Sequence, residues 1–199
     1  MTKRYAKAFR KSLAPYFFRM RAILPLLLAA TPALSDPSIF EDFQGEVAGW
    51  QYVSDRVMGG VSDGEAVLAQ DGDVIFARLT GKVSTANNGG FVQMRRGLTA
   101  PLPTDSTGLT LTVRGNGERY FVHLRTTEGR RPWQYFQAAF PSTVDWQEVT
   151  IPWSAFQPAG GLSSRLKPTD IRSIGIVAYG RDHTADLSVA QIVVNQPKS

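Results

Sequence analysis

Short runs of alternating apolar and polar residues, separated by Gly, Asn, Asp and Pro, most limit what this chain can fold into. In the run GLTLTVRG, residues 108–115, the apolar and polar side chains fall on opposite faces of an extended strand. The run RYFVHLRT, residues 119–126, repeats the pattern. Asn116-Gly117 separates the two runs and favours a hairpin turn, because both residue types tolerate positive φ. The pattern therefore predicts β-strands.

Comparable runs fill the rest of the chain after residue 36, and none of its segments shows a helical stripe with capping residues. Single short turns are expected at PWSAF and PTDIRS. About ten regularly spaced strands predict an all-β fold, a two-sheet β-sandwich, with a closed barrel as the alternative. The further runs are DVIFARLTG, FVQMRR, WQYFQAAF, WQEVTIP, IRSIGIVAYG and LSVAQIVV.

The first 35 residues differ sharply from the remainder in charge. They contain seven basic residues and no Asp or Glu, which leaves 15 basic and 17 acidic residues in the rest of the chain. The net charge of +5 therefore belongs to this leader. The sequence gives no reason to expect nucleic acid as a partner.

The leader has the pattern of a signal peptide. Basic residues precede the apolar stretch AILPLLLAATPA, and small residues follow at Ala33 and Ser35. We therefore expect a signal peptide at 1–35, an exported protein (periplasmic or secreted), and one domain at 36–199. Met20 is an alternative start, and an uncleaved amphipathic or transit-like segment is the alternative to a signal. The apolar stretch falls short of the roughly 20 residues that span a membrane, so no transmembrane segment is expected after cleavage.

The residue types argue against catalysis. The chain has no cysteine, which excludes thiol nucleophiles and thiolate metal sites. His123 and His183 are the only histidines, and neither has a companion at zinc-site spacing. Nucleophile elbows, phosphate loops and dinucleotide fingerprints are also missing from the sequence. We expect no enzyme activity, no cofactor and no metal. The segment DGD at 71–73 is a weak calcium candidate and more typical of a turn.

The motif SDRVMGGVS joins two of the expected strands. One interpretation is a structural loop, in which Gly59 and Gly60 supply unusual backbone angles while Asp55 and Arg56 fix the loop by hydrogen bonds. The other is a recognition surface, with Arg56 and Met58 presented by the Gly-Gly turn. The two roles are compatible.

Further candidate binding residues carry amide, guanidinium and indole groups. Asn87 and Asn88 form either a plain connection or an amide-lined rim for a polar partner or a sugar. Three further candidates lie on predicted strands. Their side chains lie either on a solvated face of a sheet or on a concave binding face. Trp133 follows Arg-Arg-Pro in a loop and is the best exposed aromatic candidate. The strand candidates are Arg95, Arg125 and Gln137.

Several phrases together resemble the complex I intermediate-associated protein family. They are W-x-x-x-S-D-R-V-M-G-G-V-S from Trp50, NNGGF at 87–91, L-x-V-R-G-N-G-x-x-Y from Leu111, and W-x-x-V-x-I-P-W-x-x-F ending at Phe156. The resemblance implies a galactose-binding-like jelly-roll sandwich and a non-catalytic binding or assembly role. Mitochondrial members help to assemble respiratory complex I, but an export signal would place this chain outside the compartment where the matrix arm is built.

Two functions are expected on this basis. The first is a protein-binding assembly factor of the cell envelope, with a membrane or respiratory complex as its partner. The second, from another class, is an exported carbohydrate-binding module, because hydroxyl-rich sugars suit amide side chains and stack on aromatic rings.

Overall fold

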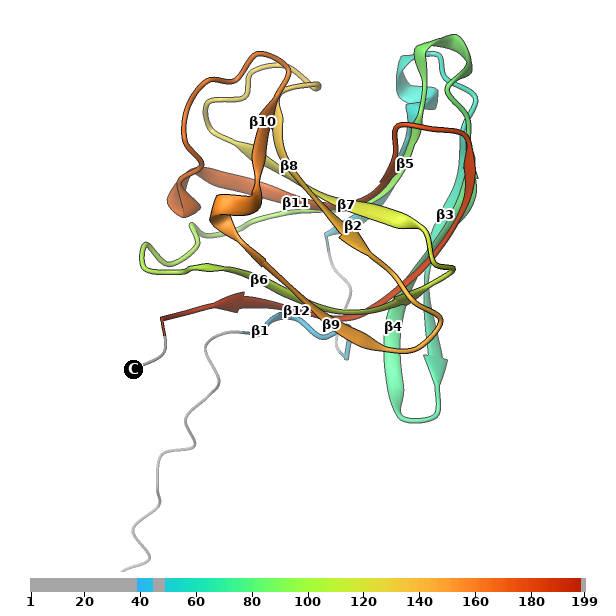
Figure 1. Ribbon diagram of the computed structural model, residues 1–199, viewed down its shortest axis with the longest axis horizontal. Coiled ribbons are helices and arrows are strands. Elements are labelled where there is room, and N and C mark those ends of the chain that lie inside the picture. The colour runs from blue at the N-terminus through green and yellow to red at the C-terminus, as the bar shows by residue number, and fades with distance from the viewer. Residues whose placement is uncertain (1–38, 45–48, 198–199) are drawn as a thin grey trace, which may run out of the picture. The chain divides into compact units, whose positions relative to one another are not determined.

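The computed structural model describes residues 39–44 and 49–197, which form two open antiparallel sheets packed face to face (Figure 1). The predicted all-β two-sheet sandwich is therefore confirmed over the closed barrel. The expected signal peptide and the domain start at residue 36 lie outside the described residues and stay predictions. Among the described residues, no helix has the length and apolar character to cross a membrane.

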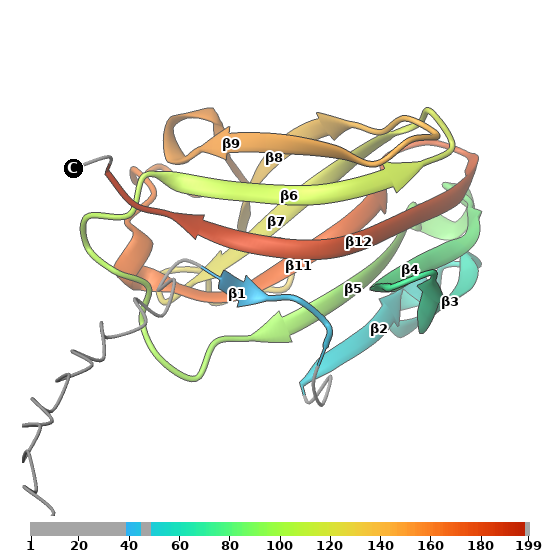
Figure 2. The same cartoon turned by 90° about the horizontal axis from the view of Figure 1, so that it is seen from below.

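The first sheet, here called the β12 sheet, is built around the longest strand. Its order is β3 (Asp63–Asp71), β4 (Val74–Val83), β12 (His183–Asn195), β6 (Gly108–Gly115) and β9 (Gln147–Pro152). The short β1 (Ile39–Glu41) also pairs with β12. Figure 2 shows that β4 and β1 lie along the same side of β12, one after the other.

The second sheet, here called the β11 sheet, carries three of the predicted site residues, Arg95, Arg125 and Gln137. Its order is β10 (Gln157–Ala159), β8 (Tyr135–Pro141), β7 (Arg119–Thr126), β11 (Ile171–Tyr179), β5 (Phe91–Gly97) and β2 (Trp50–Ser54). Four short 3-10 turns complete the described elements: η1 (Asp55–Met58), η2 (Ala86–Asn88), η3 (Trp153–Ala155) and η4 (Pro168–Asp170). The turns expected at PWSAF and PTDIRS are thus present.

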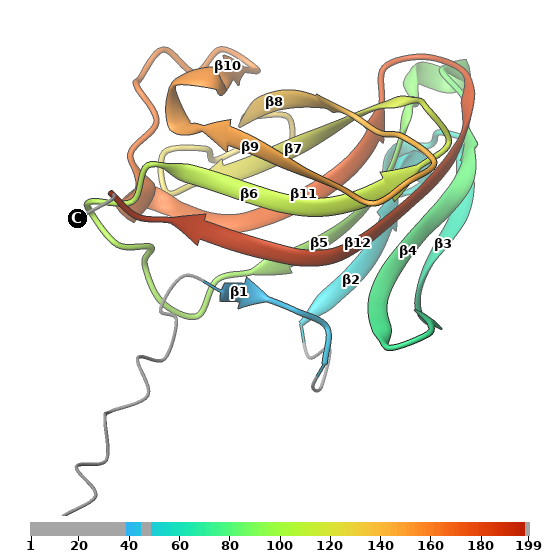
Figure 3. The ribbon, with the colours of Figure 1, turned by 60° about the horizontal axis from the view of Figure 1, so that its bottom comes forward.

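The prediction of a hairpin at Asn116-Gly117 is wrong. β6 pairs with β9 and β12, whereas β7 pairs with β8 and β11, so the turn connects the two sheets (Figure 3). Gly117 does adopt a positive φ of 83°. Asn116 donates to the Thr184 carbonyl at 2.8 Å and accepts from the Tyr120 hydroxyl at 2.8 Å. The turn chemistry reverses the chain, but contacts far away in sequence decide which strand each run pairs with.

The core lies between the sheets and follows the predicted alternation. Tyr120, Val122 and Leu124 of β7 are fully buried, and so are the alternate apolar residues of β6. Burial of each large apolar side chain contributes about 1.5–3 kcal/mol. This packing fixes the inner faces and leaves the outer faces and the loops to present functional side chains.

Candidate functional site

The SDRVMGGVS motif folds as a strand, a helical turn and a strand. β2 ends at Ser54, η1 follows, and β3 begins at Asp63. Gly59 ends η1 with a φ of 92° and donates its N–H to the Arg56 carbonyl at 3.2 Å. The N–H of Gly60 bonds the Asp55 carbonyl at 3.0 Å. A side chain at Gly59 would be strained in this left-handed conformation.

The Asp55 carboxylate accepts four hydrogen bonds that hold the loop, and the Asp55 side chain is completely buried. One carboxylate oxygen accepts the Ser62 N–H at 2.9 Å. The other accepts the Ser62 hydroxyl at 2.5 Å, the Gly90 N–H at 2.5 Å and the Phe91 N–H at 3.2 Å. Burial alone would raise the pKa of Asp55, but these hydrogen bonds together outweigh it and lower the pKa. Asp55 therefore stays ionised and holds two separate loops together.

Two glycines leave the space that the Asp55 carboxylate occupies. A Cβ at Gly60 would stand 2.3 Å from the carboxylate carbon, and a Cβ at Gly89 would stand 2.5 Å from a carboxylate oxygen. Ser62 extends the network, since its hydroxyl accepts the Ser84 N–H at 2.9 Å. The GG of SDRVMGGVS and the first G of NNGG are therefore parts of one structure, although about thirty positions separate them.

The motif also presents exposed side chains around this buried support. Val57, Met58 and Val61 are 75%, 57% and 47% exposed, and we call these three residues the loop tip. Arg56 is exposed too, and its guanidinium lies 3.4 Å from the equally exposed Asp63. A surface ion pair of this kind contributes little stability. Single exposed apolar residues are ordinary, and here three of them lie on one loop that the Asp55 hydrogen bonds fix.

Asn87 and Asn88 lie in η2, next to the Asp55 network. Both are exposed and adopt left-handed φ values of 56° and 57°. Asparagine tolerates this conformation better than most residues. Their backbone shapes the approach to Gly89 and Gly90, while a rim of amides for a ligand stays a prediction.

The remaining predicted residues gather on the outer face of the β11 sheet. Gln137 lies opposite His123, His123 opposite Gly175, and Gly175 opposite Arg95. Arg125 is the next outward residue along β7, after His123. Its guanidinium donates to the Pro132 carbonyl at 2.6 Å and so anchors the β7–β8 loop. Register thus brings side chains from three strands onto one surface.

Trp133 stands in the β7–β8 loop at the β8 end of this surface. It is 52% exposed, and the Arg131 guanidinium lies 5.5 Å from its ring centroid. The loops near β8 and β10 rise on one side of the β11 sheet, and the η1 and η2 turns rise on the other (Figure 1). The predicted site residues therefore form two groups, one in the Asp55 loops and one on or beside the outer sheet face.

Sequence reasoning missed an aromatic cluster on that face, formed by Phe121, His123, Tyr135 and Tyr179. The His123 ring stacks on Tyr135 at a centroid distance of 4.1 Å and meets Tyr179 edge-on at 5.4 Å. Tyr179 and Phe121 form a further T-shaped pair, with ring centroids 5.7 Å apart. Alternation along β7 places Phe121 and His123 outward, but their neighbours on β8 and β11 follow only from the strand order.

Burial controls the protonation of this cluster. Desolvation, followed by repulsion from Arg125, lowers the pKa of His123 to about 4, so the ring is neutral at physiological pH. Burial and then the neighbouring Tyr179 hydroxyl raise the pKa of Tyr135. Nε2 of His123 and Oε1 of Gln137 are buried and have no hydrogen-bond partner among the described residues. Such atoms are uncommon in folded proteins and mark positions where a water or a ligand group can bind.

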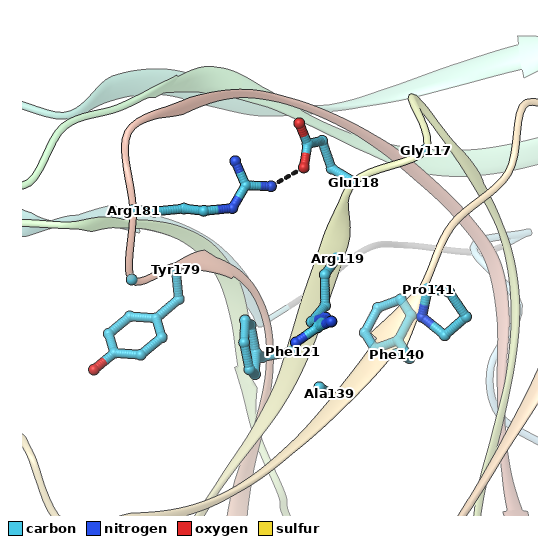
Figure 4. Close-up of a pocket in the computed structure, with 10 residues that line it drawn as sticks. Gly117, Glu118, Arg119, Phe121, Ala139, Phe140, Pro141, Tyr179 and Arg181 are labelled. Carbon is cyan, nitrogen blue, oxygen red and sulfur yellow. Dashed lines mark hydrogen bonds and ion pairs between the residues drawn. The ribbon is translucent and has the colours of Figure 1, made fainter.

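An open pocket of about 790 Å³ adjoins the aromatic cluster. Phe121 and Tyr179 belong to both, and the Arg119 side chain lies between Phe121 and Pro141 in Figure 4. Arg181 pairs with Glu118 at the pocket edge. Within residues 39–44 and 49–197, no three His, Cys, Asp or Glu residues gather as metal ligands. The outer face of the β11 sheet therefore presents aromatic rings, an amide and guanidinium groups, which can stack on a ligand ring or donate hydrogen bonds.

Solved structures with a similar fold include carbohydrate-binding modules. A family 11 module of a cellulosomal cellulase of Clostridium thermocellum aligns with 80% of this chain and 94% of its own, at a TM-score of 0.66 and 15% identity. A family 30 module from the same organism aligns with 81% of this chain and 98% of its own, at 0.59 and 16%. At these identities the likeness establishes the fold, a galactose-binding-like jelly roll.

Comparison at the level of sequence identifies the family. Curated proteins gave no match. Residues 40–189 match the family described as Complex I intermediate-associated protein 30 (CIA30), and this range contains the Asp55 loops and all six strands of the β11 sheet. The chain therefore belongs to the complex I intermediate-associated protein 30 family.

Proposed function

We propose that the protein is a non-catalytic binding module that acts as an assembly factor and holds a protein partner at the loop tip. The observation that carries the proposal is the contrast between a fully buried Asp55 and the exposed Val57 and Met58 beside it. The buried hydrogen bonds fix the loop before binding, so little conformational entropy is lost when the apolar side chains dock. The family description supports an assembly role.

The partner that fits this surface is an apolar patch on a subunit of a membrane-bound respiratory complex. The family is named for intermediates of complex I, and the loop tip offers a small apolar contact with Arg56 and Asp63 at its rim. An apolar centre with a charged rim is the usual plan of a protein interface. If the leader directs export, the contact would be with the part of the complex that faces the cell envelope.

Site-specific photo-crosslinking tests the proposal. A photo-reactive amino acid is placed at Met58 or at Val144, which is 77% exposed and lies between β8 and β9. In cells that assemble the native complex, position 58 should crosslink to one respiratory-complex subunit and position 144 should not. Equal crosslinking at the two positions, or crosslinks at 58 to unrelated proteins only, would rule out the loop tip as the docking site.

Carbohydrate binding at the outer face of the β11 sheet is a second candidate function. One similar solved structure is a family 11 module in complex with a β-1,3-1,4-mixed-linked tetrasaccharide, with 15% identity to this chain. The aromatic cluster and the amide of Gln137 give this chain the group types that bind sugars. A glycan array probed with the purified full chain tests this function. Binding of a defined glycan that weakens in Trp133→Ala or Tyr179→Ala supports it, and the absence of any glycan binding rejects it.

A further inference from the structure

The strands of the β11 sheet differ from those of the β12 sheet in charge. None of the six strands of the β11 sheet contains Asp or Glu. The strands of the β12 sheet contain six carboxylates: Glu41, Asp63, Glu65, Asp71, Glu148 and Asp186. A sheet surface without carboxylates and with several arginines attracts anions.

Three arginines of the β11 sheet project from its outer side without a carboxylate partner. Within the part of the chain that the structure describes, Arg95, Arg119 and Arg125 form no ion pair, although Arg96 pairs with Glu41. Burial and the nearby charge of Arg95 lower the pKa of Arg125. The two cations therefore repel each other across β11. An anion between them would relieve this repulsion and accept charge-assisted hydrogen bonds.

The rest of the outer face suits a ring with hydroxyl groups. Tyr135 and Tyr179 cover His123, and Tyr179 is 36% exposed. The His123 ring and the Gln137 amide lie opposite each other and contribute two of the buried polar atoms that have no hydrogen-bond partner among the described residues. Aromatic faces stack on the C–H side of a sugar, and amides bond its hydroxyls. The pocket beside Phe121 continues the surface and adds Arg119 as a further cation, while the Glu118 carboxylate in its lining pairs with Arg181.

We propose that the outer face of the β11 sheet, from Arg95 and Arg125 past the aromatic cluster to Arg119, binds an anionic saccharide. This inference rests on the second candidate function and specifies the charge of its ligand. A carboxylated sugar and a sulfated sugar share the required chemistry, which is an anionic group on a hydroxylated ring. The guanidinium groups bind the anion, the amide bonds the hydroxyls, and Tyr179 supports the ring.

Binding of four probes to the purified full chain tests the proposal by calorimetry. The probes are oligogalacturonate (carboxylated), a carrageenan oligosaccharide (sulfated), a mixed-linked β-glucan tetrasaccharide (neutral) and a polyglutamate peptide (anionic without sugar). At least one anionic sugar should bind about tenfold or more tightly than the neutral glucan and the peptide, which corresponds to 1.4 kcal/mol. Its affinity should fall as salt is added, because salt screens exposed charges.

Matched charge variants locate the site. Arg95→Gln removes one positive charge from the outer face, at a side chain for which the described residues show no hydrogen bond. Lys82→Gln removes one charge from the exposed side of β4 in the other sheet. Arg95→Gln should weaken binding of the anionic sugar about tenfold, as expected for loss of one hydrogen bond to a charged group. Lys82→Gln should leave it unchanged.

The outcomes separate this inference from the function on which it rests. Equal, salt-independent binding of neutral and anionic sugars would overturn the anionic assignment and leave carbohydrate binding standing. No binding of any sugar would overturn both. Polyglutamate binding as tight as that of the sugars would reject a saccharide site. Equal effects of Arg95→Gln and Lys82→Gln would show that the anion binds elsewhere.

Discussion

The carboxylate of Asp55 lies directly against the backbone of Gly60, so closely that a Cβ at position 60 would stand 2.3 Å from the carboxylate carbon. The carboxylate cannot move aside without losing its bonds to Ser62, Gly90 and Phe91. The Gly-Gly pair of the motif is therefore required by packing as well as by backbone angle. The loop is a rigid support for the exposed side chains next to it.

Gly60→Ala should destabilise the protein by about 1–3 kcal/mol, because the added methyl group overpacks a buried polar centre. Gly97→Ala is the matched control, because a Cβ at position 97 would stand 3.9 Å from the Arg172 carbonyl oxygen, at ordinary contact distance. Urea unfolding of both variants measures the difference. Equal stability of the two would show that the Asp55 network adapts to a side chain and is not rigid.

Asp55→Asn should reduce stability in a pH-dependent way. The folded protein lowers the pKa of Asp55 below its unfolded value of about 3.9. The charged form therefore stabilises the fold above that pH, and this stabilisation is lost as pH falls through the folded pKa. The difference in unfolding free energy between wild type and Asp55→Asn should be largest near pH 7 and shrink toward pH 3. A difference that stays constant over this range would show that the Asp55 carboxylate does not stabilise the fold through its charge.

Titration of His123 should lower the free energy of unfolding on acidification, and this should begin at a higher pH than the effect of Asp55. Its folded pKa of about 4 lies below the unfolded value of about 6.5, so the unfolded chain binds the extra proton first. Stability should decline as pH falls from about 6.5 toward 4, and His123→Phe should remove this part of the decline. NMR titration of the imidazole gives the pKa directly. A midpoint near 6.5 would show that the ring is open to water and that the cluster does not cover it.

Local pattern was enough to predict most of the fold. The alternation in β6 and β7 gave both strands and their buried faces, and the ten expected strands are present. The two others, β1 and β10, have three residues each, which is too short for a periodic signal. The pairing of β6 and β7 could not be read locally, because Asn-Gly fits a turn between sheets as well as a hairpin.

The candidate site was predicted in part. The motif alone marked Asp55, Gly59 and Gly60, but burial of Asp55 depends on Gly89 and Gly90, whose approach requires the tertiary fold. Arg95, Arg125 and Gln137 were placed on strands correctly. Their position on the same face as Tyr135 and Tyr179 depends on the strand order of the β11 sheet, and the alternation of apolar and polar residues does not predict that order.

If Asp55 supports the loop while the loop tip makes the contact with the partner, Met58→Ser should weaken binding without weakening the fold. Affinity for the respiratory-complex subunit crosslinked at position 58 would be measured together with unfolding free energy, with Val144→Ser as the control. Met58 is 57% exposed, so its replacement should change stability by less than about 0.5 kcal/mol. Loss of a side chain that is buried on docking should weaken binding about tenfold or more. Unchanged affinity in Met58→Ser, equal to that of Val144→Ser, would contradict docking of the partner at the loop tip.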